Sequence, residues 1–357
     1  MAHKILVINP GSTSTKIAVF EDEKEILSSS IAHDAKTIDK FRDVIDQLGF
    51  RMEDVRGQLE KWGLDLSSLS AVIGRGGLLP HLKAGGYLVN DSMVEFIMAG
   101  KASPHASNLG AVIANEIAKP LGIPAYIYDA VTADEMSDIA KITGMPDVER
   151  ESMCHVLNMK AVSKKFAAEL GTTYEKLDLI VAHLGGGITV GVHHEGKIID
   201  CIRDDAGPFS IERAGSIPLL YIIDMCYSGV YNKKEMVRRI RGMGGLKAYL
   251  GTQDCREIES MIAGGDERAK ILYEAQAYQI AKGIGEMAPV INGKLDYIIL
   301  TGGMAYSKMM TSMVEERVKF IAPVKVIPGE NEMEALALGA LRMLQGEAYH
   351  VFGEEEK

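Results

Sequence analysis

The stretch Ile5–Val19, ILVINPGSTSTKIAV, consists of an apolar run, a turn rich in glycine and hydroxyl residues, and a second apolar run. Leu179–Val192, LIVAHLGGGITVGV, repeats this order about half a chain later, with a triple glycine in the turn. Short β-branched runs that end at glycine or proline predict strands joined by turns. Self-similarity at this distance predicts an internal duplication with two similar domains, and two unrelated hairpins are the alternative.

The segments after each hairpin predict helices and further strands, which is typical of an α/β fold. We expect an N-terminal α/β domain at 1–170, rejoined by a C-terminal helix at 333–350, and a second α/β domain at 171–332. Apolar spacing also predicts helices at Ile38–Leu48 and Val55–Trp62.

The composition is that of an ordinary globular protein, with 357 residues of which 47% are hydrophobic and 25% are charged. It excludes a disordered chain, a fibrous repeat and a small disulfide scaffold. The 39 basic and 49 acidic residues give a net charge of −10. This balance argues against a nucleic-acid binder, although it does not argue against nucleotides, which are held by local donors.

The cysteines form no Cys-x-x-Cys pair, so neither a zinc site nor a redox motif is indicated. Scattered cysteines in a chain of this size are typical of a reducing compartment. The apolar run Ile5–Ile8 near the N-terminus is too short for a signal peptide or a membrane span. We therefore expect a soluble, cytoplasmic protein.

Glycine-rich turns follow several of the predicted strands. The first, NPGSTSTK at Asn9–Lys16, offers hydroxyl groups and backbone N–H donors to a phosphate, and Lys16 can add a positive charge. In the second, HLGGG at 183–187, the glycines let a backbone approach a ligand closely. The third, TGGM at 301–304, ends a predicted strand and precedes a helix, which suits a nucleoside or its phosphates. The alternatives are an ordinary polar hairpin and a flexible turn.

Charged side chains stand at the ends of predicted strands, where open α/β folds bind ligands. Arg75 lies between glycines after a buried strand, Asp129 ends another strand, and Arg213 lies between a polar turn and a predicted helix. Two arginines suit an anionic substrate and a phosphoryl group, and surface ion pairs are the alternative. His105 and His155 are further candidates, although a lone histidine is more often structural.

Taken together, these motifs resemble the acetokinase family. The opening INPGSTSTKIAV is similar to the family's N-terminal signature, and SPHASN, YIYDAV, HLGGGITV, ERAGSIP and LTGG follow in the family's order. The resemblance covers nearly the whole chain. It implies membership of the superfamily of actin, hexokinase and heat-shock ATPases. The implied fold has two duplicated ribonuclease-H-like α/β domains of the acetate and sugar kinase type, with ATP in the interdomain cleft and the nucleotide held by the second domain.

The chain also departs from the family's pattern. The superfamily usually has Asp in the first turn, and this chain has Asn9, which weakens a role as a strong metal ligand. Acetate kinases have a second histidine where this chain has Met159, so no role is carried over to that position. The second turn reads HLGGG rather than HLGNG, and the C-terminal segment reads PGENEMEALALGALRML. Both features resemble family members that act on butyrate.

The resemblance implies roles for individual residues. Arg75 would hold the substrate carboxylate with His105 nearby, Arg213 would hold the transferring phosphoryl group, and His155 would donate a hydrogen bond to it. Asp129, assigned to the catalytic residues, would orient Mg²⁺ together with Glu332 and Asn9, and Glu334 is an alternative to Glu332. The residues implied in nucleotide and phosphate binding are Asn9, Gly11, Ser12, Ser14, Lys16, His183, Gly185, Gly186, Gly187, Gly302 and Gly303.

The implied reaction is reversible phosphoryl transfer between ATP and butyrate, giving butyryl phosphate and ADP. A short carboxylic acid ionises near the pKa of a free Glu side chain, about 4.3, so no general base is needed at neutral pH. Catalysis then consists of positioning and charge neutralisation. Acetate, propionate or a branched-chain fatty acid is an alternative substrate. A more distant alternative function is that of a non-catalytic regulator that binds ATP. The resemblance further implies a homodimer or larger homo-oligomer, with no nucleic-acid or membrane partner.

Overall fold

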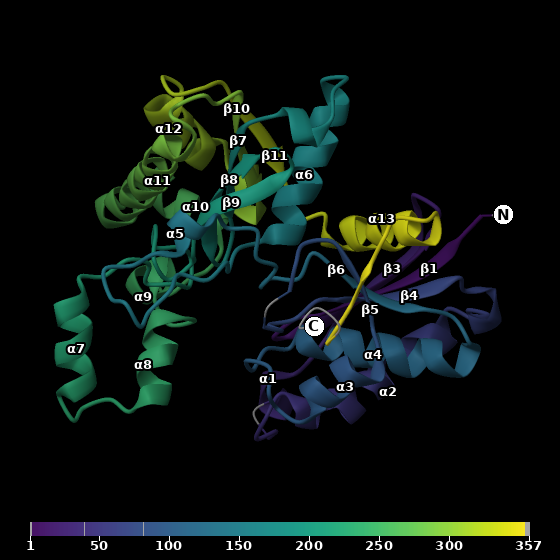
Figure 1. Ribbon diagram of the computed structural model, residues 1–357. Helices are drawn as coiled ribbons and strands as arrows, with labels where there is room; N and C mark the ends of the chain where they lie inside the picture. The colour runs from purple at the N-terminus through teal and green to yellow at the C-terminus, as the bar shows by residue number, and fades with distance from the viewer. Residues whose placement is uncertain (1, 39, 81, 354–357) are drawn as a thin grey trace. The chain divides into compact units, whose positions relative to one another are not determined.

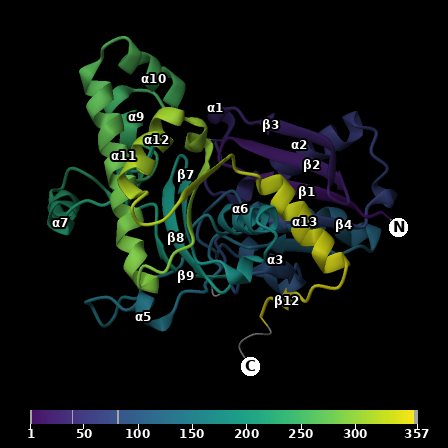
Figure 2. The same cartoon turned by 90° about the horizontal axis from the view of Figure 1, so that it is seen from above.

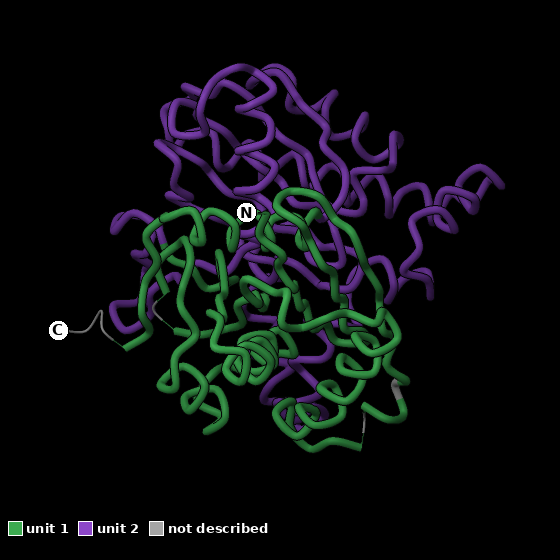
Figure 3. The backbone as a smooth tube through the Cα atoms, turned by 90° about the vertical axis from the view of Figure 1, so that its right-hand side faces the viewer, with its two compact units in different colours: residues 1–134, 331–357 green, residues 135–330 purple. Residues whose placement is uncertain are grey.

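The computed structural model describes residues 2–38, 40–80 and 82–353 (Figure 1). The chain divides into two compact units, which Figure 3 colours separately. Unit 1 comprises residues 1–134 and 331–357, and unit 2 comprises residues 135–330. Within the described residues, no helix is both long enough and apolar enough to cross a membrane.

Unit 1 is built on a seven-stranded sheet with the order β12-β5-β6-β4-β1-β2-β3. β1 pairs in parallel with β4 and antiparallel with β2, β2 is antiparallel to β3, and β4 is parallel to β6. The strands are β1 (Lys4–Pro10), β2 (Ser14–Glu21), β3 (Lys24–Ala32), β4 (Ala71–Arg75), β5 (Gly86–Leu88), β6 (Ala125–Tyr128) and β12 (His350–Val351). The helices are α1 (Ala35–Ile38), α2 (Leu48–Lys61), α3 (Asp91–Met98), α4 (Asn108–Ala118) and α13 (Glu332–Leu344).

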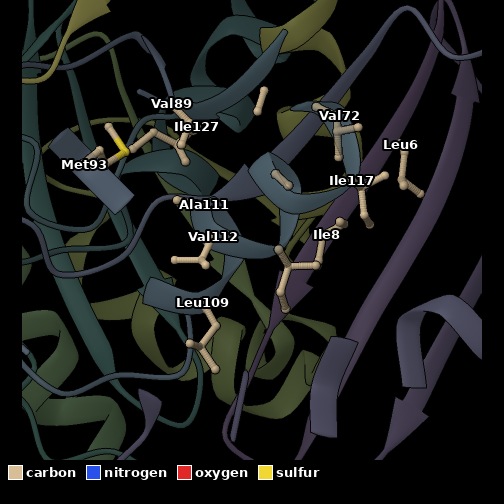
Figure 4. Close-up of a cluster of buried hydrophobic side chains, with 14 of the residues drawn as sticks. Leu6, Ile8, Val72, Val89, Met93, Leu109, Ala111, Val112, Ile117 and Ile127 are labelled. Carbon is tan, nitrogen blue, oxygen red and sulfur yellow. The ribbon is translucent and has the colours of Figure 1, made fainter. Parts of the chain in front are cut away.

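Helices α4 and α13 both pack on β1, β4 and β6, and Figure 1 shows them on opposite faces of this sheet. The two faces explain why the run Ile5–Ile8 is apolar without alternation, since every one of its side chains is buried. Leu6 and Ile8 face the α4 side, where they join the core cluster drawn in Figure 4. The alternate residues of β1, ending in Asn9, therefore face α13.

Unit 2 repeats this topology in a five-stranded sheet with the order β11-β10-β7-β8-β9. β7 is parallel to β10 and antiparallel to β8, β8 is antiparallel to β9, and β10 is parallel to β11. The strands are β7 (Leu179–Leu184), β8 (Ile188–His194), β9 (Lys197–Ile202), β10 (Tyr297–Gly302) and β11 (Val324–Pro328). Strand order and direction match β6-β4-β1-β2-β3 of unit 1, which confirms the duplication expected from the two hairpins.

Helix α6 packs on β7 and β10. The long helix α11 packs on β7, β8 and β9 (Figure 2). Ile180, Ala182 and Leu184 of β7 belong to the core cluster that contains the buried face of α11, so His183 faces the α6 side. The helices of unit 2 are α5 (Asp138–Lys141), α6 (Val156–Glu169), α7 (Leu219–Tyr227), α8 (Lys233–Ile240), α9 (Gly245–Leu250), α10 (Cys255–Ala263), α11 (Glu267–Met287) and α12 (Lys308–Val318).

The structure differs from the sequence-based expectation at two places. Residues 135–170 belong to unit 2 rather than to the first domain, because α6 places its buried side chains against β7 and β10. The helix expected at Ile38–Leu48 was wrong: α1 ends at Ile38, and among the described residues 40–47 there is a 3₁₀ turn at Ile45–Gln47 and no α-helix before α2 begins at Leu48. That segment contains few buried side chains, so the apolar spacing there does not mark a core-facing helix.

Strand β8 carries a buried histidine that makes the folding free energy dependent on pH. His193 is fully buried, its Nδ1 lies 2.7 Å from the Tyr174 hydroxyl, and burial, aided by the charge of Lys160, lowers its pKa from 6.5 to about 3. The unfolded chain binds the proton below pH 6.5 and the folded chain does not, so this stabilisation is complete above pH 6.5 and is lost as the pH falls toward 3. We predict a loss of about 2 kcal/mol between pH 7 and pH 5 from His193 alone.

Urea unfolding followed by far-ultraviolet circular dichroism at pH 7 and pH 5 checks this value. His193→Gln removes the titration, so the variant is expected to lose less stability than the parent over the same interval, whatever its stability at pH 7. Parallel losses in the two proteins would contradict the prediction.

Candidate functional site

Polar side chains stand in a row along one edge of the unit 1 sheet. β1, β4 and β6 are parallel, so their carboxyl ends meet at this edge, where β2 begins. Asp129 follows β6, Arg75 ends β4, Asn9 lies near the end of β1, and Lys16 lies opposite Asn9 in β2. Directly opposite residues of an antiparallel pair project to the same side of the sheet, so Lys16 and Asn9 share a face.

Glu332, the first residue of α13, ties this row together. Its carboxylate accepts hydrogen bonds from Asn9 Nδ2 at 2.7 Å and from a terminal nitrogen of Arg75 at 2.6 Å. Glu332 is 8% exposed, whereas Glu334 on the same helix is exposed. Of the two carboxylates left open by the sequence, Glu332 is therefore the one that joins the sheet-edge residues. We call Asn9, Arg75, Asp129 and Glu332 the edge cluster.

The backbone at Asp129 is held in an unusual conformation. Its φ of 42° lies in the left-handed region, which is uncommon for a residue with a side chain. Two hydrogen bonds to Gly85 hold it there: Asp129 N–H donates to Gly85 O at 3.0 Å, and Gly85 N–H donates to Asp129 Oδ1 at 2.8 Å. The side chain is buried and its carboxylate is oriented by these bonds at the end of β6.

The edge cluster suits a hydrated cation held by few protein ligands. Among the described residues, no group of three or more acidic, histidine or cysteine side chains could hold a metal on its own. Mg²⁺ usually keeps several waters and takes one or two carboxylates beside phosphate oxygens. Oδ1 of Asp129 accepts the hydrogen bond from Gly85 N–H, and Asn9 uses its amide nitrogen for Glu332. The oxygens of Asp129 and Asn9 thus provide a hard-ligand set of the kind Mg²⁺ takes.

The first glycine turn follows β1 beside the edge cluster, and a buried arginine of α2 stabilises it by hydrogen bonds. Gly11 N–H donates to Ser14 O at 2.7 Å, which closes the turn. Arg51 has no exposed surface, and its guanidinium donates to Ser14 O at 3.3 Å, to Thr15 Oγ1 at 3.0 Å and to Ser12 O at 3.4 Å. The shape of this turn therefore depends on a charged side chain 37 residues away from Ser14 in the sequence.

His105 lies in the loop before α4, at the same end of unit 1. It is exposed, and its Nδ1 lies 2.6 Å from Ser107 Oγ and accepts a bond from Ser107 N–H at 3.2 Å. Asn108 connects this loop to the segment after Arg75: it donates to Ser103 O at 2.8 Å and accepts from Leu78 N–H at 2.7 Å. The SPHASN motif thus supports the loop that follows Arg75.

Unit 2 holds a pair of stacked histidines next to its glycine turn. His155, at the start of α6, lies over His183 of β7 with ring centroids 3.8 Å apart and an interplanar angle of 7°. His155 Nδ1 is 2.9 Å from Oγ1 of Thr189, which stands opposite His183 in β8. His183 Nδ1 is 2.8 Å from Asn158 Oδ1 in α6. We call His155, His183, Thr189 and Asn158 the histidine cluster.

Arg213 is held against the second glycine turn. Gly186 O accepts hydrogen bonds from Ser210 Oγ and from Glu212 N–H, the latter at 3.2 Å, so the segment that carries Arg213 follows the turn. The carboxylate of Asp204 accepts from Arg213 Nε at 3.1 Å and from Arg241 at 2.5 Å. Arg241 also donates to Asp205 at 3.1 Å, and a carboxylate oxygen of Glu212 lies 3.9 Å from Arg213, so carboxylates hold both partly buried arginines beside the glycines.

The second and third glycine motifs of the sequence meet at one cavity of about 710 Å³. Its size lies in the range of small-molecule sites. Gly302 has a φ of 90°, and a Cβ there would lie 2.4 Å from Leu184 O, so only glycine lets β10 pass this close to β7. The cavity is lined by Gly185, Gly186, Ile211, Gln253, Asp254, Cys255, Arg256, Glu259, Gly303, Met304, Tyr306, Ser307 and Glu330.

The structure brings most of the expected residues into these groups, within each unit. Sequence reasoning missed Arg51, Asn158, Thr189, Arg241 and the segment Gln253–Arg256. Gly242 directly after Arg241 and the charged pair Asp254 and Arg256 at a helix start were available signals. Arg51 and Asn158 gave no signal, since both lie within amphipathic helices and only the tertiary structure shows their partners.

Comparisons with known proteins identify relatives of this arrangement. The model of the acetokinase family matches residues 150–333. The structure is similar to acetate kinase from Porphyromonas gingivalis, with 20% identity over 96% of this chain and 100% of that chain and a TM-score of 0.78. A propionate kinase from Francisella tularensis has 19% identity over 94% of this chain and 98% of its own, with a TM-score of 0.74. Acetate kinase from Entamoeba histolytica has 17% identity, covers 96% of this chain and 100% of its own, and gives a TM-score of 0.76.

The glycine pair at the end of β10, Gly302 and Gly303, offers a matched test of how the cavity is built. Gly302→Ala adds a Cβ at a positive φ and 2.4 Å from a backbone oxygen, whereas a Cβ at Gly303 meets nothing within 4 Å. We predict that Gly302→Ala lowers the free energy of unfolding by at least about 2 kcal/mol, whereas Gly303→Ala changes it by less than about 1 kcal/mol. Urea unfolding of the two variants measures both values, and equal losses would contradict this account of Gly302.

Proposed function

The chain belongs to the acetokinase family, and we propose that it is a short-chain fatty-acid kinase that transfers a phosphoryl group reversibly between ATP and butyrate. The observation that carries the proposal is that one chain contains two groups of residues that can bind anions, one in each unit. The edge cluster contains Arg75 together with side-chain oxygens that could bind a cation. Unit 2 contains two arginines and a cavity lined by glycines. A kinase for a carboxylate must hold two anions, the acceptor and the nucleotide.

Arg75 is proposed to bind the acceptor carboxylate. Glu332 occupies one terminal nitrogen of its guanidinium, and arginine has five N–H donors, so a second carboxylate can be bound by the remaining ones. The ion pair fixes the plane of the guanidinium before substrate arrives, which reduces the entropy lost on binding. The acceptor is already ionised at neutral pH, so Arg75 orients the nucleophile and no base is required.

Arg213 is proposed to neutralise charge on the transferring phosphoryl group. Phosphoryl transfer depends mainly on positioning and on stabilising charge at the phosphoryl oxygens. Asp204 holds Arg213 and Arg241 in place, so their positive charge is preorganised and needs no rearrangement during the reaction. His155, stacked on His183, is proposed to donate a ring N–H to the same phosphoryl group.

The cavity of unit 2 is proposed to receive the nucleoside of ATP. Gly185 and Gly186 on one side and Gly303 on the other let backbone groups approach the phosphates and ribose. The first glycine turn, with Gly11, Ser12, Ser14 and the charge of Lys16, is proposed to add donors for the phosphates. Mg²⁺, when bound, would neutralise phosphate charge, and Asp129 and Asn9 would hold it, with Glu332 acting through water.

Butyrate is proposed as the substrate within the family. The HLGGG turn and the segment PGENEMEALALGALRML support it through their resemblance to members that act on butyrate. Acetate, propionate or a branched-chain acid would use the same arginines, so pocket shape alone separates these alternatives.

The exposed apolar side chains of α7, with Leu219 78% and Tyr227 87% exposed, support the proposal of a homo-oligomer.

A panel of carboxylates tests the substrate. Initial rates with Mg-ATP and acetate, propionate, butyrate, isobutyrate or isovalerate are measured by trapping the acyl phosphate as its hydroxamate. We predict the highest kcat/KM for butyrate and a loss of about tenfold or more for each methylene removed, since one methylene is worth roughly 1–3 kcal/mol in such pockets. A higher value for acetate would overturn the butyrate assignment. An absence of turnover with every acid would overturn the kinase proposal and favour a regulator that binds ATP.

The two acids at the start of α13 provide a matched pair of variants. Glu332→Gln removes the charge that fixes Arg75, whereas Glu334→Gln changes an exposed side chain on the same helix. We predict that Glu332→Gln lowers kcat/KM for butyrate by about 10- to 100-fold, as is usual for residues that orient a binding group, and that Glu334→Gln stays within about twofold. The larger loss in Glu334→Gln would assign the role to the other carboxylate.

A further inference from the structure

Asn158 of α6 is a buried amide whose hydrogen bonds are all directed to other segments of unit 2. It is 1% exposed. Its Nδ2 donates to Glu330 O at 2.7 Å and to Gly329 O at 3.2 Å, and its Oδ1 lies 2.8 Å from Nδ1 of His183. A buried amide with three such contacts is oriented by them, because an unpaired polar group is costly in the interior.

These contacts fix the proton on His183. Backbone carbonyls only accept hydrogen bonds, so the atom that faces Gly329 and Glu330 must be the amide nitrogen of Asn158. The atom that faces His183 is then the amide oxygen, which also only accepts. The Nδ1 of His183 must therefore carry a proton, and neutral His183 has its lone pair on Nε2.

The partner of His155 leads to the opposite assignment. Thr189 Oγ1 accepts a hydrogen bond from the backbone N–H of His155 at 3.4 Å. The single hydroxyl proton of Thr189 can be donated to the ring Nδ1 of His155 at 2.9 Å or to Met159 Sδ at 3.7 Å. A thioether is a weak acceptor, so the ring nitrogen takes the proton. Neutral His155 then carries its own proton on Nε2.

We propose that Asn158 is a positioning residue: it holds His183 as the Nδ1-protonated tautomer and, through the stacked His183 ring, holds His155 with its Nε2–H toward the phosphoryl group. The kinetic part of this inference rests on the proposed function, whereas the tautomer assignment rests on unit 2 alone. The ring of His155 is held by stacking on the face of His183 and by its hydrogen bond with Thr189. If the His183 ring were less well oriented, the Nε2–H of His155 would be less well oriented too.

Nitrogen NMR of the ligand-free protein tests the tautomers directly. Long-range proton–nitrogen spectra of histidine-labelled protein at pH 8, where ordinary imidazoles are neutral, show which ring nitrogen carries the proton. The His183 and His155 signals are assigned by their loss in His183→Asn and His155→Asn. We expect Nδ1–H on His183 and Nε2–H on His155 in the parent protein. Nε2–H on His183 would overturn the proposal.

Two variants of Asn158 separate its roles. Asn158→Asp keeps an acceptor for His183 Nδ1 and loses the donor to the carbonyls, so the tautomer is expected to remain. Asn158→Leu removes the acceptor, so the Nε2–H form of His183 is expected to gain population and kcat to fall by about 10- to 100-fold, with a smaller change in KM for ATP. Ser163→Ala is the control, since the hydroxyl of this buried serine of α6 donates to Met159 O of its own helix.

The outcomes distinguish this inference from the proposed function. If no carboxylate is phosphorylated but the tautomers are as expected, the proposed function fails and the role of Asn158 in holding His183 remains. If Asn158→Leu does not fold, the spectra of the parent and of Asn158→Asp still decide the assignment. A kcat in Asn158→Leu equal to that of Ser163→Ala, with the His183 tautomer unchanged, would overturn the proposal.

Discussion

The site depends on the alternation of side chains along two buried hairpins. Each sheet is covered by helices on both faces, so successive residues of β1 and β7 face different helices. The last polar residue before each glycine turn, Asn9 in one unit and His183 in the other, faces the helix that begins beside the turn. Glu332 of α13 meets Asn9, and Asn158 of α6 meets His183. The duplication thus produced two equivalent positions that now carry different chemistry.

An acidic protein that handles two anions needs cations that are fixed in place. The net charge of −10 conceals how the arginines of the candidate site are arranged, because Arg75, Arg213 and Arg241 are each held by a carboxylate. Arg75 is paired with Glu332, and Arg213 shares Asp204 with Arg241. These ion pairs are partly buried, so their value lies in orientation more than in stability, since desolvation offsets much of the attraction. The arginines can still bind a ligand because a guanidinium has more donors than one carboxylate can occupy.

The strands and the sheet edge were predictable from sequence because their signals are local. Buried parallel strands give apolar runs, and Arg75 and Asp129 follow such runs directly, so both fall at the carboxyl edge. The sequence pattern predicts a boundary at 170, since no feature of the sequence shows that α6 packs on the second sheet. Asn158 and Arg51 escaped prediction for the same reason: a polar residue within a helix reveals its partner only when the fold brings that partner near. The short strands β5 and β12 also gave too little pattern to be recognised.

The most direct test of the central claim, that placed arginines on unit 2 neutralise the phosphoryl group, is the turnover of Arg213→Ala with Mg-ATP and saturating butyrate. Arg239→Ala is the matched control, because that arginine is exposed on α8 and stacks on Tyr231 rather than joining Asp204. The account predicts a fall in kcat of roughly 10²- to 10⁴-fold for Arg213→Ala, the range for loss of a preorganised charge stabiliser, and little change for the control. Near-normal turnover of Arg213→Ala would contradict it.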